Sequence, residues 1–209
     1  MTSSPFTPIE QALMELQKGR MIILVDSASR EDEGDLIIAA EKVTPADINF
    51  MITHGRGFVC VPSTGEMLDR CQIPMMTPSR NSSRLQAPFT VSVDATVGIT
   101  TGVSADDRCL TIQRMVDPQS GPDDFMIPGH IFPLRANDGG VLVREGHTEG
   151  SVDLLKLAGL RPIAVLCEIM NEDGSMARLD DLILFARKHN LCLVSVQDVV
   201  TAVRKNKDQ

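Results

Sequence analysis

The stretch MIILVDSASREDEGDLIIAA, residues 21–40, carries the pattern that decides the fold. Two short apolar runs, at 21–25 and 36–40, are separated by a polar connection that is rich in acidic residues. Apolar runs of four to eight residues between polar segments are typical of buried strands. We therefore predict two neighbouring buried strands with the acidic segment as their connection.

Outward from this stretch, strand and helix signals alternate along the chain. Short apolar or alternating runs predict strands at 58–61, 89–94, 130–136 and 164–170, and a final strand and helix within 191–204. Helical spacing and capping residues predict helices at 8–18, 44–54, 64–71, after Ser104, at 149–158 and at 179–189. We expect 140–148 to supply a strand ending at the helix cap Thr148, and 74–88 and 117–129 to be long loops.

Interspersed strands and helices indicate an α/β (α+β) fold. We predict a single-domain mixed sheet covered by helices, in a sandwich that resembles three layers. No change in composition marks a linker, so residues 1–209 are expected to form one domain. About residues 1–7 and 205–209 are expected to fray.

The composition excludes several classes of function. Twenty Lys and Arg residues against 28 Asp and Glu residues give a formal net charge of −8, which disfavours binding to nucleic acids or anionic membranes. The chain has no Trp, no Tyr and seven Phe, so it lacks the aromatic platforms that bind single-stranded nucleic acid. No apolar run approaches the roughly 20 residues that cross a bilayer. We expect no nucleic-acid partner and no membrane partner.

Motif searches exclude common nucleotide and hydrolase sites. The chain contains no GxxxxGK[ST] loop, no GxGxxG fingerprint, no GxSxG elbow and no HExxH pair. An EF-hand loop starting at Asp26 is excluded because Ala28 and Arg30 stand where oxygen ligands are needed. Five cysteines without paired spacing favour reduced thiols, and the N-terminus lacks a secretory pattern. We therefore expect a cytoplasmic protein.

The acidic connection REDEGD, residues 30–35, is the first candidate site. It holds four carboxylates in six residues, and like charges this dense repel one another unless a cation is bound. Carboxylate oxygens suit Mg²⁺, and Arg30 adds a fixed cation that suits a phosphate or a carboxylate. The alternative is an ordinary solvated connection between two strands.

The segment REGHT, residues 144–148, is the second candidate site. It lies at the predicted start of a helix, where free backbone N–H groups and the helix dipole attract anions. Arg144 would strengthen that attraction, and His147 could ligate a metal or transfer a proton. The alternative is an ordinary helix cap with a surface histidine.

His130 and Glu168 form the third candidate site. Glu168 interrupts the apolar run AVLCEIM, residues 164–170, and a carboxylate is costly to bury without a partner, so Glu168 is a candidate base. The alternatives are a glutamate at a strand end that reaches solvent and, for His130, a histidine that hydrogen-bonds the backbone.

Eight segments, in order along the chain, resemble the 3,4-dihydroxy-2-butanone 4-phosphate synthase family. Each segment alone is a weak signal, but together they cover almost the whole chain. The segments are REDEGD (30–35), FVCVP (58–62), FTVSVDA (89–95), GITTGVSADDR (98–108), PGHIFPLRA (128–136), GGVLVREGHTEGSVDL (139–154), LAGLRPIAVLCEIMNEDGSMAR (157–178) and FARKHNL (185–191).

The resemblance implies a reaction and a set of site residues. The family converts D-ribulose 5-phosphate to 3,4-dihydroxy-2-butanone 4-phosphate and formate with Mg²⁺, a step of riboflavin biosynthesis, and Mn²⁺ is the alternative ion. Glu31 and His147 are the implied metal ligands. The implied proton-transferring catalytic residues are His130, Glu168 and Asp35. The implied substrate-binding residues are Arg30, Glu31, Asp35, Arg144, Glu145, Gly146, His147, Thr148 and Glu168.

The resemblance also implies a homodimer whose active sites lie between the subunits, so that His130 acts on the partner's substrate. Because the chain ends after one synthase domain, we expect the form without a fused GTP cyclohydrolase II domain. Residues 81–88 depart from the family pattern, and Glu145 stands where many relatives have a small residue. Two other functions stay open: another metal-dependent sugar-phosphate enzyme, such as an isomerase or aldolase, and a non-catalytic Mg²⁺-binding module.

Overall fold

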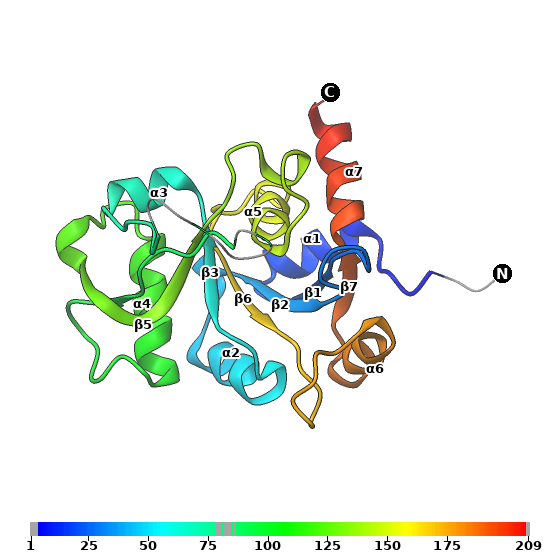
Figure 1. Cartoon of the computed structure of the whole chain (residues 1–209), viewed down its shortest axis with the longest axis horizontal. Coiled ribbons are helices and arrows are strands. Elements are labelled where there is room, and N and C mark those ends of the chain that lie inside the picture. Colours follow the sequence, from blue (N-terminus) through cyan, green and yellow to red (C-terminus); the bar gives the residue numbers. More distant parts are fainter. Residues whose placement is uncertain (1–3, 78–80, 82–84, 86, 208–209) are drawn as a thin grey trace.

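Figure 1 presents the computed structural model, in which helices flank a central sheet. The structure describes residues 4–77, 81, 85 and 87–207. The strands are β1 (Ile22–Val25), β2 (Gly34–Ala39), β3 (Cys60–Ser63), β4 (Val93–Ala95), β5 (Phe125–Arg135), β6 (Ala164–Glu168) and β7 (Cys192–Ser195). The α-helices are α1 (Ile9–Gln17), α2 (Pro45–Phe50), α3 (Gly65–Arg70), α4 (Ala105–Val116), α5 (His147–Leu157), α6 (Leu179–His189) and α7 (Val196–Lys207).

Across the described residues, seven strands form one mixed sheet in the order β4-β5-β3-β6-β2-β1-β7. Strand β2 pairs antiparallel with β1 and β6, whereas β7 joins β1 and β5 joins β3 in parallel. The register of the β1–β2 pair aligns Val25 with Gly34, so the acidic connection closes a hairpin at one end of the sheet. The predicted mixed sheet and the two strands within 21–40 are therefore confirmed.

Helices cover both faces of this sheet and complete three layers. One face carries α1, α5 and α7, and the other carries α2, α4 and α6 (Figure 1). Successive side chains of a strand point to opposite faces, so Ile22 and Leu24 pack in one core and Ile23 and Val25 pack in the other. All four side chains are buried, which explains why this strand is apolar without interruption.

Several local sequence signals are confirmed by the structure. Helix α6 has the predicted bounds, Leu179–His189. Thr44 caps α2 with a reciprocal pair of hydrogen bonds to Asp47, in which the Thr44 side chain accepts from the backbone and the Asp47 carboxylate accepts from the Thr44 N–H. Ser104 caps α4 by accepting a 3.0 Å hydrogen bond from the Asp107 N–H. In each case the helix end is set by residues close together in the sequence, so it can be predicted from a short segment.

The predicted loop at 117–129 is wrong at its C-terminal end, because strand β5 begins at Phe125. Strand β4 pairs with this extension, aligning Ala95 with Phe125 and Asp94 with Met126, after a bulge between Val93 and Asp94. The extended conformation thus depends on pairing with a distant segment. The segment 117–129 is rich in Pro and Gly, and its own residues do not indicate that pairing.

The predicted strand at 140–148 is wrong. Residues Gly140–Leu142 form a 3₁₀ turn, and helix α5 already begins at His147. The Val141 N–H donates a 2.8 Å hydrogen bond to the buried carboxylate of Asp153, which ties this turn to α5. The apolar residues of the segment therefore pack against α5 as a turn. The pattern of apolar and polar residues alone does not predict this contact.

The chain has defined contacts near both ends. The Thr7 N–H donates a 2.7 Å hydrogen bond to the Leu193 carbonyl, and α7 continues to Lys207, both within the segments that we expected to fray. Residues 1–3 and 208–209 lie outside the described residues, as do parts of the predicted loop at 74–88. Among the helices described, none is both long and apolar enough to cross a membrane.

Candidate active site

Asp26, the residue after β1, organises the acidic connection. Its buried carboxylate accepts hydrogen bonds from the Arg30 guanidinium at 2.8 Å, from the Glu31 N–H at 3.1 Å and from the Glu33 N–H at 3.0 Å. The Asp26 N–H in turn donates to the Glu33 carbonyl. One carboxylate therefore folds the connection back on itself and sets the direction of the Glu31 side chain.

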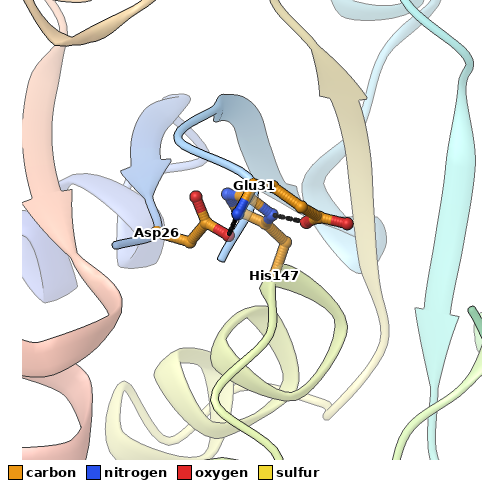
Figure 2. Close-up of side chains that lie close together, drawn as sticks. All are labelled: Asp26, Glu31 and His147. Atoms are coloured by element: carbon orange, nitrogen blue, oxygen red, sulfur yellow. Dashed lines mark hydrogen bonds and ion pairs between the residues drawn. The ribbon is translucent and has the colours of Figure 1, made fainter. Parts of the chain in front are cut away.

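His147 approaches the acidic connection from the first turn of α5. Its Nδ1 lies 3.4 Å from Glu31 Oε2 and 3.8 Å from Asp35 Oδ2, and the imidazole is buried (Figure 2). Gly146, not the predicted Thr148, is the residue that caps the helix. The shift places His147 inside the first helical turn, which directs its side chain toward β2.

Asp26, Glu31 and His147 could hold a metal ion together. One ligand atom from each residue lies within 4.8 Å of the others, and Figure 2 shows the three side chains converging. The neighbouring Asp35 Oδ1 and His147 Nε2 are buried without a hydrogen-bond partner. Unpartnered polar atoms are costly in a protein interior, so they indicate a site for a ligand atom or an ion. The donor set of carboxylates and one imidazole fits a divalent cation.

The same residues have strongly shifted pKa values. Burial raises the pKa of Asp35 to about 7, although the nearby His147 opposes this change. Burial alone would lower the pKa of His147, but the carboxylates of Asp35, Glu31 and Asp26 outweigh it and raise the pKa to about 9. The contact with His147 and the charge of Arg30 hold the pKa of Glu31 below its ordinary value. Such opposed shifts are common at functional sites.

Arg30 and Arg144 meet around Gly146 next to the cation site. A Cβ atom at Gly146 would lie 2.6 Å from Arg144 Nη1 and 2.9 Å from Arg30 Nη2, so a side chain here would displace both guanidinium groups. Arg144 also donates a 2.6 Å hydrogen bond to Glu149, a fully buried carboxylate on α5. Two arginines beside a helix N-terminus form an arrangement that suits a phosphate group.

Glu168 lies at the end of β6, directly opposite Asp35 in the β2–β6 register. Its Oε2 accepts a 2.6 Å hydrogen bond from the Phe58 N–H. The carboxylate is neither deeply buried nor free in solvent. It faces the pocket from the strand next to Asp35, and its role as a base stays a prediction.

A cavity of about 130 Å³ joins these groups. Its lining residues are Arg30, Glu31, Glu33, Asp35, Cys60, Ala87, Pro88, Phe89, Leu134, Arg144, His147, Thr148, Leu166 and Glu168. The structure thus brings together seven of the predicted site residues, from Arg30 through Glu168. Glu145 is exposed and does not line this cavity.

His130 is the predicted site residue that lies apart. It is on β5, two strands from β6, and does not line the cavity. Its Nδ1 is 2.7 Å from the Asp94 carboxylate, and its backbone N–H also donates to Asp94 at 2.9 Å. The His130 side chain is 45% exposed, whereas that of Asp94 is 6% exposed. A buried carboxylate therefore orients a histidine whose ring faces outward.

Sequence reasoning missed the part that Asp26 plays in the site. In the sequence, Asp26 stands out only as a candidate first ligand of an EF-hand loop, and that motif fails. The available signal was a carboxylate directly after a buried strand, where a side chain can accept the N–H groups of a tight connection. Glu149 was missed because it looked like an ordinary acidic residue in a first helical turn.

Together, the fold and the pocket define a class. This is a three-layer α/β protein with a carboxylate–histidine cluster that could hold a cation, beside a pair of arginines that suit an anion. A sequence profile of the 3,4-dihydroxy-2-butanone 4-phosphate synthase family matches residues 10–202, so this chain belongs to that family. The resemblance drawn from the eight sequence segments is confirmed.

Individual relatives support the same assignment. A 3,4-dihydroxy-2-butanone 4-phosphate synthase of Neisseria meningitidis serogroup A is 52% identical over 197 residues, which are 94% of this chain and 54% of that protein. This chain therefore spans about half the length of that relative. A synthase of Agrobacterium fabrum is 50% identical over 196 residues, covering 94% of this chain and 92% of the relative.

A solved structure supports the fold over the full length of its chain. It is a 3,4-dihydroxy-2-butanone 4-phosphate synthase in complex with two magnesium ions, and its TM-score with this protein is 0.91. The two sequences are 39% identical, and the match covers 97% of this chain and 99% of the other. The predicted fold class is thus confirmed.

Proposed function

We propose that this protein converts D-ribulose 5-phosphate to 3,4-dihydroxy-2-butanone 4-phosphate and formate, as a carbon–carbon lyase of riboflavin biosynthesis. Membership of the synthase family supports the reaction. The five cysteines are free thiols, and this supports a reducing, cytoplasmic location.

One observation carries the proposal. A single small cavity joins a carboxylate–histidine cation site to two arginines and to Glu168, although these residues come from segments more than 100 positions apart in the chain. A sugar phosphate presents a phosphate at one end and adjacent oxygens at the other. The two arginines match the first end and the cation site matches the second.

Asp26, Glu31 and His147 are the residues proposed to hold Mg²⁺, with Mn²⁺ as the alternative to be distinguished by measurement. When bound, the ion would supply Lewis-acid polarisation of the substrate's carbonyl group. The protein residues do the remaining work. Arg30 and Arg144 bind the phosphate, and the Gly146 backbone leaves room for it at the start of α5.

The proposed proton transfers use carboxylates on neighbouring strands. Asp35, with a pKa raised to about 7 by burial, can both accept and give a proton near neutral pH. Glu168 faces the same cavity, held by the Phe58 N–H. In the proposed sequence a base removes the C3 proton, the C1 hydroxyl is lost as water, the carbon skeleton rearranges, and one water molecule adds back so that C4 leaves as formate. The apolar lining from Phe89, Leu134 and Leu166 limits access of water to reactive intermediates.

We further propose a homodimer in which His130 of one subunit completes the cavity of the other. The support is an apolar surface around His130, which we call the β4–β5 face. It consists of Val97, Val103, Met126 and Ile127, whose exposed fractions range from 44% to 71%. Clusters of exposed apolar residues are typical of a subunit interface.

A formate assay tests the proposed function. Purified protein with D-ribulose 5-phosphate and Mg²⁺ should release one formate per substrate consumed, and EDTA should stop the release. An isomerase or aldolase would consume substrate without losing a carbon as formate. A protein that binds Mg²⁺ but consumes no sugar phosphate would instead be a non-catalytic module. Either result contradicts the proposed reaction.

A further inference from the structure

Arg178 contacts the acidic connection from outside the cavity. Its Nη1 donates hydrogen bonds to the Glu31 carbonyl at 2.7 Å and to the Asp32 carbonyl at 2.6 Å. The residue lies at the start of α6, about 146 positions later in the chain. Arg178 is not among the residues that line the cavity.

The connection needs an external support at this point. Asp32 has a φ of +57°, a left-handed conformation that residues other than glycine seldom adopt. Glu31 and Asp32 lie outside the β1–β2 ladder, so their carbonyls need partners other than the neighbouring strand. A guanidinium group, which carries several N–H donors in one plane, can bind both.

Helix α6 also contacts the connection at a second point. A Cβ atom at Gly34 would lie 2.5 Å from Leu182 Cδ1, so the start of β2 packs directly against the α6 side chain. Arg178 and Leu182 are one turn apart on α6. The acidic connection is therefore fixed between Asp26 on its inner side and α6 on its outer side.

We propose that Arg178 is a positioning residue for the cation site, which holds the Glu31 backbone so that the Glu31 carboxylate faces His147. This inference deepens the proposed function and rests on it for its catalytic meaning. The argument itself needs only the two carbonyl contacts and the 3.4 Å Glu31–His147 pair. Residues that orient metal ligands without touching the metal commonly change metal affinity by ten- to a hundredfold.

A general loss of stability can be separated from this role. The Arg178 side chain is exposed, so its replacement removes little buried area. Its backbone N–H, which donates to Asp181 and caps α6, stays in place in any variant other than proline. The melting temperature should therefore change by about 2 °C or less, while the cation site loosens.

The test compares the Arg178→Gln variant with Arg187→Gln and Arg178→Lys. Arg187 is an exposed arginine in the last turn of the same helix, and it is a matched control for loss of charge from α6. Mn²⁺ and Mg²⁺ binding is measured by calorimetry without substrate, alongside the melting temperature. Arg178→Gln should weaken cation binding about tenfold or more, Arg187→Gln should leave it unchanged, and Arg178→Lys should restore part of it.

The outcomes separate this inference from the proposed function. Equal cation affinity in the wild type and Arg178→Gln overturns the positioning role, even if the wild type releases formate. Absence of measurable cation binding by the wild type overturns it as well. If the wild type binds the cation but releases no formate, the proposed reaction fails, while weaker binding by Arg178→Gln still supports the positioning role. If Arg178→Gln does not fold, the Arg178→Lys variant decides between the two roles. If Arg178→Lys binds the cation as tightly as Arg187→Gln does but has a lowered melting temperature, Arg178 has only a structural role.

Discussion

The cavity and the β4–β5 face differ in how completely one chain builds them. At the cavity, Asp26 and Glu31 of the acidic connection converge with His147 of α5, and the Asp26 and His147 side chains are buried. On the β4–β5 face, Asp94 orients a single histidine, His130, whose side chain remains 45% exposed among apolar residues. The first region is a pocket whose lining one chain supplies, and the second is a surface.

This difference teaches that two regions of one subunit can contribute to the same reaction although they are not in contact with each other. The groups proposed to bind the cation and the phosphate are held in place by their neighbours before a ligand arrives. A histidine on an apolar surface becomes part of a site only when another subunit covers it. The proposed dimer therefore divides the site into a binding half and a proton-transfer half, and the following experiments test that division.

The largest expected effect comes from mixing two inactive variants. His130→Ala and Glu168→Ala should each lower formate release by about 10²- to 10⁴-fold, because each removes a proton-transfer group. In a shared site, heterodimers formed from the two variants contain one intact site out of two. After unfolding and refolding a mixture, activity should recover to about a quarter of the wild-type value, since half of the dimers are mixed.

Two controls accompany the mixing experiment. Each variant refolded alone should stay inactive, and a mixture of Glu31→Ala with Glu168→Ala should stay inactive too, because both residues line the same subunit's cavity. Recovery in that second mixture, or none in the first, would mean that His130 does not act across the interface.

The next effect is on the β4–β5 face itself. Val103→Asp should place a charge in the proposed interface twice, once for each subunit, and such a charge is costly to desolvate. We expect the dimer to dissociate at concentrations about 100-fold higher than the wild type, with formate release falling in parallel. Sedimentation velocity measures the first change.

Leu184→Asp is the matched control for that variant. Leu184 is 64% exposed on α6, away from the β4–β5 face, so an aspartate there should leave the dimer unchanged. Cation binding should also be unchanged in Val103→Asp, because one chain forms that site. A monomer that keeps full activity would contradict the division between the two regions.

A smaller effect is expected from Glu149, which fixes Arg144 within the cavity. Glu149→Gln keeps an oxygen that can accept from the Asn137 N–H but weakens the charge-assisted bond to Arg144. The KM for the sugar phosphate should rise about tenfold with kcat nearly unchanged. The phosphate does not react, so its binding is weakened equally in the ground state and in the transition state. Steady-state kinetics checks this, with Glu66→Gln in the first turn of α3 as the control. A fall in kcat alone would assign Glu149 a different role.

The smallest expected change is the release of about one proton when a cation binds. In the cation-free protein, His147 keeps its proton up to about pH 9, because the charges of Asp35, Glu31 and Asp26 outweigh burial. A cation that binds this imidazole displaces the proton, so binding should weaken as pH falls, by about tenfold per pH unit below 9. Calorimetry in buffers of different ionisation enthalpy should find about one proton released per ion. Binding that does not depend on pH would remove His147 from the cation site.

Much of the fold was predictable because its signals are local. The apolar runs of β1 and β2, the cap at Thr44 and the helix at Leu179–His189 each depend on residues within one short window. The errors fall where distant segments decide the conformation. Pairing with β4 extends β5 to Phe125, and a hydrogen bond to Asp153 replaces the strand expected at 140–148.

The candidate site was predictable for a different reason. Residue types, spacing and the family resemblance together indicated the acidic connection, the start of α5 and Glu168, and the structure brings them into one cavity. Supporting residues were not predictable. Asp26, Glu149 and Arg178 look like ordinary charged residues in the sequence. Their partners are, in that order, backbone N–H groups, the Arg144 side chain and backbone carbonyls, and only the fold brings these groups together.

The position of β6 has a consequence for synthesis of the protein. β6 lies between β3 and β2 in the middle of the sheet, although the ribosome makes it after five other strands. Until Glu168 has emerged, the nascent chain leaves the facing edges of β2 and β3 without that partner, and unpaired edges promote aggregation. Insertion of one short strand then closes the sheet and places Glu168 opposite Asp35. Chains that stop before this strand should therefore be insoluble as well as inactive.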